Sequence, residues 1–202
     1  GPISTQQTRF LQIVKNNTER LAILVNDLLD VSRMDAGRIT LNLQAVDLHE
    51  VMEDVTADLM RRSREENKPM SLVTDIPDDI PLVDGDRERV QQIIGNLVSN
   101  AYNYTPANGQ IQVRVGIQDN EVQVDIQDNG IGIQPEDRHR VFERFYRGED
   151  PLVLATAGTG LGLSITKTLV DMHKGRIWFT SSGVKGEGTI FSVTFPLYEV
   201  QE

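Results

Sequence analysis

The sequence has 202 residues, no cysteine, and 30 acidic against 20 basic residues, which gives a formal net charge of -10. This length allows one main hydrophobic core and a smaller added element. The lack of cysteine excludes disulfides, zinc–thiolate sites and a cysteine nucleophile, and the acidic balance argues against nucleic acid or an anionic membrane as the main partner. No apolar run reaches the roughly 20 residues that cross a bilayer, and no signal peptide is visible, so we expect a soluble, cytoplasmic protein.

Residues 5–36 are expected to form one long helix. Ser4, three residues before Gln7, fits a capping box, and Gly37 stands where a carboxyl-terminal cap belongs. Apolar residues alternate along the helix in steps of four and three, which indicates the seam of a coiled coil or helical bundle. A helix that only packs on its own domain usually carries a wider stripe, so we favour a bundle helix that needs a partner. The seam positions are Phe10, Val14, Asn17, Leu21, Leu24, Leu28 and Val31.

The remainder of the chain mixes strands and helices. Strands are expected at 39–43, 70–76, 110–117, 122–128, 176–181 and 189–197, and helices at 47–66, 86–104, 135–145 and 161–173. The strands come in pairs and do not alternate strictly with helices. We therefore expect an α+β protein, an α/β sandwich in which helices cover one face of a mixed sheet. A domain boundary near residue 39 divides the chain into residues 1–38 and 39–202.

Three asparagines line one side of the helix expected at 86–104. Asn96, Asn100 and Asn103 are spaced i, i+4 and i+7, opposite an apolar side. Asparagine is a poor helix former, so an aligned row of amides favours a polar ligand over helix stability as its purpose. The amide oxygen of Asn100 could complete the shell of a magnesium ion carried by nucleotide phosphates. For this helix taken alone, a solvated face is the alternative interpretation.

The segment Asp128-Asn129-Gly130-Ile131-Gly132-Ile133 ends an alternating strand. A carboxylate at a strand end can accept a hydrogen bond from an exocyclic amine, and glycines let the backbone approach a flat ring. Adenine presents such an amine. An ordinary turn is the alternative for this segment alone.

A second glycine-rich segment, Gly158-Thr159-Gly160-Leu161-Gly162-Leu163, runs directly into a helix. Backbone N–H groups freed by glycines, beside the positive end of a helix, can bind phosphate. The spacing is not G-x-G-x-x-G and no strand precedes it, which argues against a Rossmann site, and the absence of Gly-Lys-Ser/Thr excludes a Walker loop. A flexible hinge remains the alternative.

Two further segments complete the pattern. Phe145 and Arg147, within Phe142-Glu143-Arg144-Phe145-Tyr146-Arg147, can anchor a mobile lid, and Arg147 can reach a terminal phosphate. Core aromatics and a surface arginine would explain them equally well. Before the last strand, Gly186-Glu187-Gly188-Thr189 fits a hairpin turn, and Thr189 would lie beside an adenine site.

In chain order, the five segments resemble the N (86–104), G1 (128–133), F (142–147), G2 (158–163) and G3 (186–189) boxes of sensor histidine kinases, within the wider nucleotide-binding family that includes gyrase, Hsp90 and MutL. The resemblance covers nearly the whole chain. It implies ATP and Mg²⁺ as cofactors, Asn100 as the metal ligand, and Asn96 and Arg147 as catalytic residues. The nucleotide-binding set that it implies is Asn96, Asn100, Asn103, Tyr104, Asp128, Gly130, Gly132, Ile133, Phe145, Arg147, Gly158, Thr159, Gly160, Leu161, Gly162, Leu163 and Thr189.

The resemblance also implies partners. Residues 4–36 are similar to the second helix of the dimerisation and phosphoacceptor hairpin, which implies a homodimer through residues 5–36 and a response regulator receiver domain as a partner. The phosphorylated histidine of the family lies on the first hairpin helix, which we expect upstream of this chain. His49, His139 and His173 are then expected to be structural or surface residues.

Two positions depart from the family pattern. Asn103 stands where kinases often carry a lysine, so we expect a weaker contact with phosphate. Asn96 stands where the ATP-hydrolysing branches carry a glutamate base, and because an amide cannot take a proton at neutral pH, we expect slow hydrolysis. This argues against a gyrase- or Hsp90-like ATPase. The intact boxes argue against a degenerate dimerisation module, and a protein-serine kinase of the same fold would not explain the heptad helix.

Overall fold

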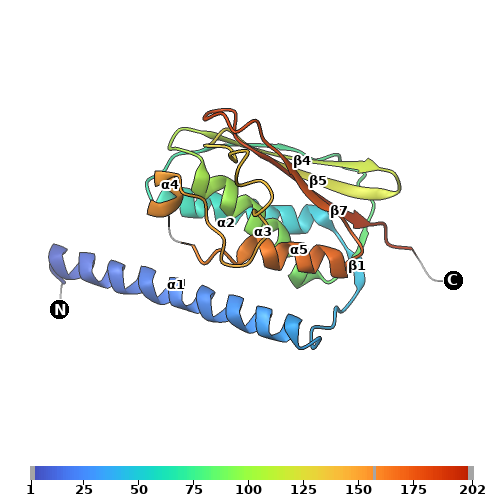
Figure 1. Cartoon of the computed structure of the whole chain (residues 1–202), viewed down its shortest axis with the longest axis horizontal. Coiled ribbons are helices and arrows are strands. Elements are labelled where there is room, and N and C mark those ends of the chain that lie inside the picture. The colour runs from blue at the N-terminus through green and yellow to red at the C-terminus, as the bar shows by residue number, and fades with distance from the viewer. Residues whose placement is uncertain (1–2, 157, 200–202) are drawn as a thin grey trace.

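The computed structural model describes residues 3–156 and 158–199. A long amino-terminal helix lies beneath an α/β sandwich (Figure 1). No helix in the described part of the chain is both long and apolar enough to span a membrane. The elements in chain order are α1 (Thr5–Asp35), β1 (Gln44–Val46), α2 (Leu48–Glu65), β2 (Ser71–Asp75), β3 (Val83–Gly85), α3 (Arg87–Tyr104), β4 (Gln110–Gln118), β5 (Glu121–Asp128), α4 (Pro151–Ala155), α5 (Gly162–Met172), β6 (Ile177–Thr180) and β7 (Ile190–Pro196).

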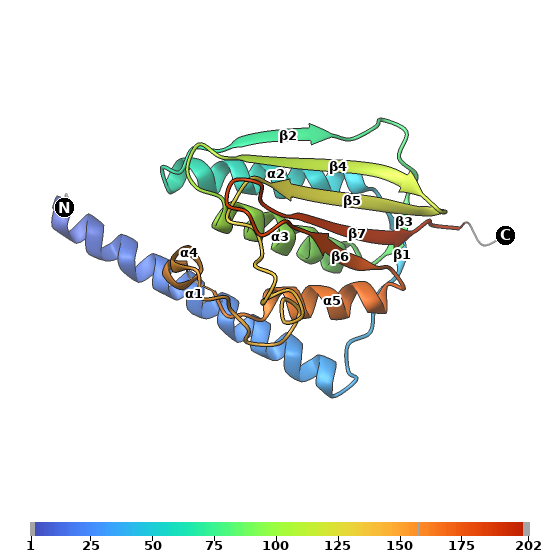
Figure 2. The same ribbon diagram turned by 45° about the horizontal axis from the view of Figure 1, so that its top comes forward.

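The main sheet has five strands in the order β2-β4-β5-β7-β6. Strand β2 runs parallel to β4, and the other neighbours are antiparallel. Helices α2, α3 and α5 lie on one face of this sheet (Figure 2). The expected mixed sheet with helices on one face is therefore confirmed. The turn between β4 and β5 uses positive φ at both Asp119 and Asn120, as a tight two-residue hairpin requires.

Strand β5 shows how the sequence pattern builds the core. Its side chains alternate between half-buried and buried positions, and Val122, Val124 and Ile126 are buried. Because alternate residues of a strand point to the same face, Asp128 lies on this inward face as well. The apolar side of α3 packs in the same core, through residues Val90, Ile93, Ile94, Leu97, Val98 and Ala101.

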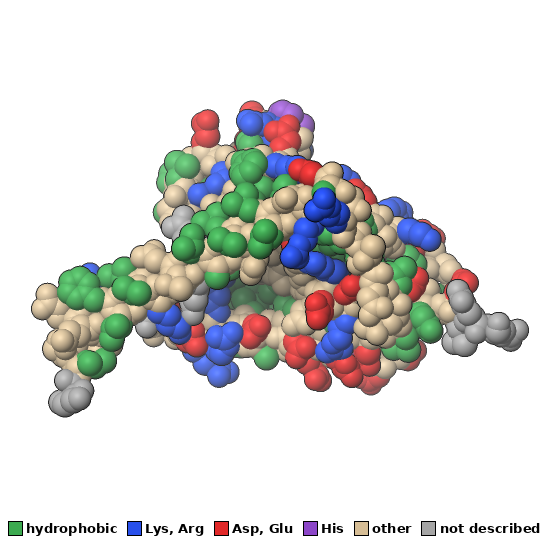
Figure 3. Space-filling view, turned by 90° about the horizontal axis from the view of Figure 1, so that it is seen from below, with side chains coloured by type: hydrophobic (Ala, Val, Ile, Leu, Met, Phe, Trp, Pro, Cys, Tyr) green, Lys and Arg blue, Asp and Glu red, His purple; other side chains and the backbone are tan. Residues whose placement is uncertain are grey.

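Helix α1 begins and ends as the sequence predicts. Ser4 and Gln7 form a capping box, and Gly37 follows the helix with a φ of 60°. The amino-terminal part of α1 projects beyond the sandwich with apolar side chains on its surface (Figure 3). At its other end, Val31 and Met34 pack against the core. The exposed apolar residues of α1 include the seam residues Phe10, Val14, Leu21 and Leu28.

The prediction of a strand at residues 39–43 is wrong. The strand lies at Gln44–Val46 instead and pairs with β3, which we did not predict. The physical reason is that the backbone N–H of Asn42 donates to the Asp86 carboxylate at 3.0 Å, which takes it out of any ladder. The three-residue strand Val83–Gly85 lies in a stretch that is rich in proline and aspartate, where the sequence indicates only turns.

The helix expected at 135–145 is also wrong. The N–H groups of Arg140 and Glu143 donate to carbonyls three residues back, not four, so this stretch forms successive tight turns. A helix that we did not predict, α4, follows at Pro151–Ala155, with Asp150 as its cap and proline at its first position. The two errors lie next to each other in the segment that differs most from regular structure.

Candidate functional site

Asp128 is the buried carboxylate of the site. It ends β5 on the inward face, and its Oδ1 accepts a hydrogen bond from the Gly130 N–H at 2.8 Å. Its side chain is among the few buried acidic groups of the described residues. Burial raises the pKa of Asp128 to about 6, although the backbone N–H groups of Gly130 and Thr189 act to lower it. At neutral pH the group is thus a mostly ionised acceptor inside the protein.

Glycines surround this carboxylate because nothing larger fits. A Cβ on Gly130 would lie 2.2 Å from the Tyr104 carbonyl oxygen, and a Cβ on Gly188 would lie 2.0 Å from the Asp128 carbonyl oxygen. The Ile131 N–H donates to the Tyr104 carbonyl at 3.1 Å. The G1 segment therefore lies directly against the end of α3 on one side and the turn before β7 on the other.

Ser181 joins the two glycine turns, and sequence reasoning missed it. Its Oγ accepts from the Ile133 N–H at 2.9 Å and donates to the Gly188 carbonyl at 2.7 Å. The Thr189 hydroxyl lies 3.4 Å from the same oxygen. Gly132, with a φ of 73°, brings the backbone to within contact of Ser181. The one available signal was the position of Ser181 at the end of a strand paired with β7.

The three asparagines of α3 have different surroundings. The Asn96 amide donates to Thr166 Oγ1 at 3.3 Å and to the Gly162 carbonyl at 3.4 Å, so it fastens α3 to the start of α5. Asn103 Oδ1 accepts from Arg62 at 2.8 Å. Within the described residues, the Asn100 side chain has no hydrogen-bond partner. Of the row, Asn100 is the amide that is open to a ligand.

The two ends of the lid segment, which is residues 145–156 and 158–161, contact each other. The Phe145 N–H donates to the Gly160 carbonyl at 2.9 Å. Phe145 has a φ of 63° and a side chain that is 63% exposed. Gly160 has a φ of 72°, and a Cβ there would lie 2.7 Å from the Phe145 carbonyl carbon. Phe145 therefore does not contribute to the core, whereas Phe142 packs against it, so the core-aromatic alternative holds for Phe142 and not for Phe145.

Arg147 holds the lid segment together. Its guanidinium donates to the Gly158 carbonyl at 3.3 Å, to the Thr156 carbonyl at 2.6 Å and to the Val153 carbonyl. Its Nε–H is buried without a partner among the described residues. Burial raises the pKa of Tyr104, and the positive charge of Arg147 opposes that shift. Arg147 thus lies within electrostatic range of the end of α3.

The glycine-rich G2 segment also contacts α1. Thr159 Oγ1 donates to Asp27 at 3.0 Å and accepts from the Leu161 N–H at 3.0 Å. Arg144 makes two hydrogen bonds to Asp35, of 2.8 and 2.6 Å. Leu161 is fully buried in the core and Leu163 packs against it. These links between the lid region and the long helix have no counterpart in the sequence pattern.

A metal ion would need ligands from outside the chain. Within the described ranges, no group of three or more His, Cys, Asp or Glu side chains could hold one. Asn100 supplies one neutral oxygen, which suits magnesium only if phosphate oxygens and water complete its shell. The histidines offer no site. His173 is buried, its Nε2 accepts from the Asp86 N–H at 3.1 Å, and its Nδ1 lies 2.7 Å from the Leu169 carbonyl, as expected of a structural residue.

The fold and the site together define a nucleotide-binding ATPase domain of the α/β sandwich class. The carboxylate at the inward end of β5, the glycine turns against it and the asparagine helix beside it all belong to one connected region. Residues 85–199 match the family described as histidine kinase-, DNA gyrase B- and HSP90-like ATPases, and the chain belongs to this family.

Within this family, the chain is similar to sensor histidine kinases. The chain is 34% identical over 196 residues to the sensor histidine kinase WalK of Bacillus subtilis (strain 168), across 96% of this chain and 31% of that protein. The full-length structure of ShkA with AMPPNP is similar with a TM-score of 0.79 and 26% identity, over 100% of this chain and 41% of ShkA. The structure of the histidine kinase ThkA in complex with the response regulator TrrA is similar with a TM-score of 0.73 and 25% identity, over 98% of this chain and 53% of that chain. The chain thus spans less than a third of the length of WalK.

Proposed function

We propose that this chain is the soluble, cytoplasmic kinase core of a two-component sensor, which binds Mg-ATP and transfers its γ-phosphoryl group to a histidine on a partner hairpin helix. Residues 39–202 would form the ATP-binding catalytic domain, and residues 1–38 would form the second hairpin helix. The observation that carries the proposal is the buried carboxylate of Asp128, enclosed by glycines that no larger residue can replace. Such a group is costly to bury unless a ligand uses it.

Adenine recognition would depend on Asp128. Its ionised carboxylate accepts from the exocyclic amine of the ring, while the Gly130 and Gly132 backbone lies against the ring face. Ser181 and Thr189 orient this wall through their mutual contact. The Gly130 N–H occupies only one oxygen of the carboxylate, which leaves acceptor capacity for the base.

Phosphate binding would use the open end of the same region. Asn100 would hold a magnesium ion through its amide oxygen, and the ion would offset the negative charge of the phosphates. Backbone N–H groups of the segment 158–162 and the amino-terminal end of α5 face the negative charge. ATP binding is a family property, and the ShkA relative was solved with AMPPNP. The magnesium role of Asn100 is part of the proposal.

Transfer of the phosphoryl group to histidine, and not to water, would follow from the lack of a general base on α3. Asn96 is an amide that is already bonded to Thr166 and Gly162, so it cannot act as a base on water. An imidazole nitrogen from another segment attacks the γ-phosphorus in line while the bond to the β-phosphate oxygen breaks. Arg147 can stabilise the spreading charge through its unpartnered Nε–H, once it turns from the lid carbonyls.

The partners follow from the same assignment. The exposed apolar side of α1 would pair with the first hairpin helix and with a second copy, through residues 5–36, as the bundle pattern requires. The ThkA relative forms a complex with a response regulator, and we propose a receiver domain of that kind as the next acceptor of the phosphoryl group.

A labelling assay tests this function. The chain is incubated with γ-labelled Mg-ATP, with and without the histidine-bearing hairpin of its own full-length protein, and Asp128→Asn serves as the inactive control. We expect acid-labile label on the hairpin, little free phosphate and no stable label on the chain itself. Rapid hydrolysis without the hairpin that Asp128→Asn abolishes would instead assign the chain to the ATPase branch of the family.

A further inference from the structure

A cavity of about 410 Å³ lies where the ends of α2 and α3 meet the lid segment. The ends of the two helices contribute Arg62, Lys68, Asn103 and Thr105 to its wall, and α4 and its cap contribute Leu152 and Thr156. Asn103 is three residues beyond Asn100, so the cavity adjoins the open amide of the asparagine row. Nothing described above assigns a ligand to it.

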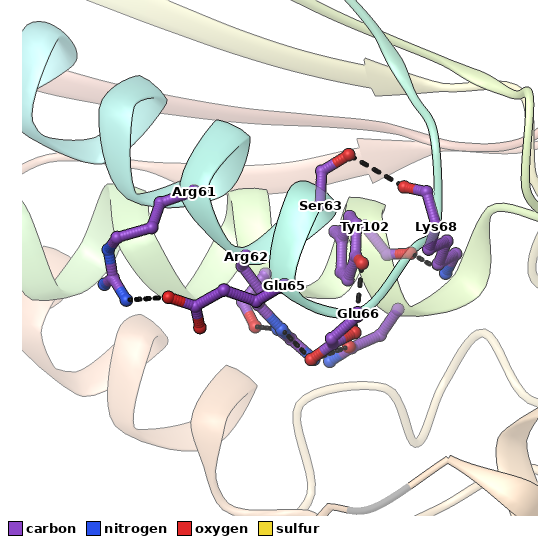
Figure 4. Close-up of polar contacts among 9 residues, drawn as sticks. Arg61, Arg62, Ser63, Glu65, Glu66, Lys68 and Tyr102 are labelled. Carbon is purple, nitrogen blue, oxygen red and sulfur yellow. Dashed lines mark hydrogen bonds and ion pairs between the residues drawn. The ribbon is translucent and has the colours of Figure 1, made fainter.

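Arg62 brings a positive charge to Asn103. Its Nη2 donates to Asn103 Oδ1 at 2.8 Å and its Nη1 donates to Ser99 Oγ at 3.2 Å. Its Nε donates to Glu66 at 2.8 Å (Figure 4), and its guanidinium carbon lies 4.6 Å from the centre of the Tyr102 ring. An arginine has five N–H donors, so two remain for a ligand.

Lys68 reinforces this charge. Its Nζ donates to the Tyr102 carbonyl and lies 4.3 Å from the centre of the Tyr102 ring. Burial lowers the pKa of Lys68, and the charge of Arg62 lowers it further, which shows that the two cations are close enough to repel. Glu66 is the one acidic residue in the wall of the cavity, against two cations. The wall therefore carries a net positive charge on a chain whose overall charge is -10.

Thr105 adds a polar group that lacks a partner. Its side chain is fully buried and lines the cavity, and its hydroxyl has no hydrogen-bond partner among the described residues. A buried hydroxyl left without a partner is unfavourable and is usually satisfied by a water or a ligand. Beside two cations, an oxygen of an anionic ligand would satisfy it.

We infer that this cavity receives the terminal phosphate of the nucleotide, and that Arg62 supplies from α2 the charge that Asn103 does not carry on α3. The inference rests on the proposed function. The lid side supports it, since the Thr156 carbonyl that borders the cavity is a partner of Arg147. Arg62 thus lines the cavity itself, and Arg147 is bonded to a residue at its border. The weaker phosphate contact expected from Asn103 is then offset by a residue 41 positions earlier.

The test compares nucleotides that differ only in the terminal phosphate. Titration calorimetry measures Kd for Mg-ATP, Mg-ADP and inorganic triphosphate with the chain, Arg62→Gln and Arg61→Gln. Arg61 is the matched control, because it is exposed and pairs with Glu65 on the surface of α2 (Figure 4) and also with Asp58. We expect Arg62→Gln to raise the Kd for ATP by at least about tenfold and the Kd for ADP by less than about threefold, as the loss of a charge-assisted contact predicts. Arg61→Gln should change neither Kd.

A rescue variant separates phosphate binding from a structural role. Adding Asn103→Lys to Arg62→Gln should restore most of the ATP affinity, because it returns the charge to the cavity from α3. Equal losses for ATP and ADP, or no loss for either, would overturn the inference while the proposed function stands. Tight binding of inorganic triphosphate without ATP competition would also overturn it. If the unmodified chain bound neither ATP nor ADP, the proposed function itself would fail.

Discussion

The two ends of the candidate site are built differently. At the adenine end, Asp128 and Gly130 are fixed by backbone contacts and by glycine positions where a Cβ would lie within about 2 Å of a carbonyl oxygen. At the lid end, Phe145 is exposed, α4 has no buried residue, and Arg147 bonds to carbonyls of its own segment. The base would therefore be read by a rigid wall, and the phosphates would be held by long side chains on a segment that can rearrange.

This contrast predicts different effects for substitutions at the two ends of the site. Changes at the adenine end should act on the stability of the fold and on every adenine nucleotide alike. Changes at the lid end should leave the fold intact and should act on the phosphates or on the motion of the lid.

The largest effect is expected for Gly188→Ala. A Cβ there would lie 2.0 Å from the Asp128 carbonyl oxygen at a φ of 67°, so β5 and the turn before β7 must separate. We expect a loss of more than about 3 kcal/mol in the free energy of unfolding, measured by urea denaturation. Gly186→Ala is the control, since its φ is 92° but no atom lies within 4 Å. It should cost only about 1 kcal/mol of backbone strain, and equal losses would mean that the wall is not rigid.

A smaller effect is expected from pH through Asp128. Its folded pKa of about 6 lies above the ordinary value of 3.8. The folded state therefore binds this proton more tightly than the unfolded state, which lowers stability as pH rises from about 4 to 6. Asp128→Asn should remove that penalty, with a gain on the order of 2 kcal/mol above pH 6 that disappears toward pH 4. A gain that did not depend on pH would contradict this origin.

The ionisation of Asp128 also controls the affinity for adenine nucleotides, which should fall as the pH is lowered, while the stability of the fold rises. The adenine amine needs the charged acceptor, so Kd for ADP should rise by up to about tenfold between pH 7.5 and pH 5. Titration calorimetry in buffers of matched ionic strength measures this. Inorganic triphosphate has no adenine amine, so an equal change in its Kd would show that the effect does not come from Asp128.

The smallest effect on stability is expected at the contacts between the lid region and α1. Asp27→Ala and Asp35→Ala remove the partners of Thr159 and Arg144. The Arg144–Asp35 ion pair is exposed and contributes little. The hydrogen bond from Thr159 to Asp27 is offset by the burial that raises the pKa of Asp27, so we expect no measurable change in the free energy of unfolding for either variant. Hydrogen exchange of residues 145–156 should become faster, while the backbone near Gly130 should be unchanged. Asp58→Ala, on the far side of α2, is the control. Unchanged exchange in the lid segment would show that α1 does not restrain it.

The same contrast decided what the sequence could predict. Asp128 and its glycines were found because strand alternation and turn chemistry are local patterns, and the structure brings them together. The helix expected at 135–145 failed because its N–H groups bond to carbonyls three residues back, a choice that side-chain spacing does not reveal. Ser181 and Arg62 were missed because each acts on residues more than 35 positions away. Local sequence patterns therefore predict the adenine end of the site better than the lid end.

The most direct measurement is the binding of AMPPNP to the chain and to Asp128→Asn in parallel, by titration calorimetry at pH 7.5, with the melting temperature of each protein as a control for folding. We expect binding by the chain and a loss of at least about 100-fold in the affinity of the variant, whose melting temperature should be unchanged or higher. Equal affinity in two folded proteins would contradict this expectation, because Asp128 would then not be the group that binds the base.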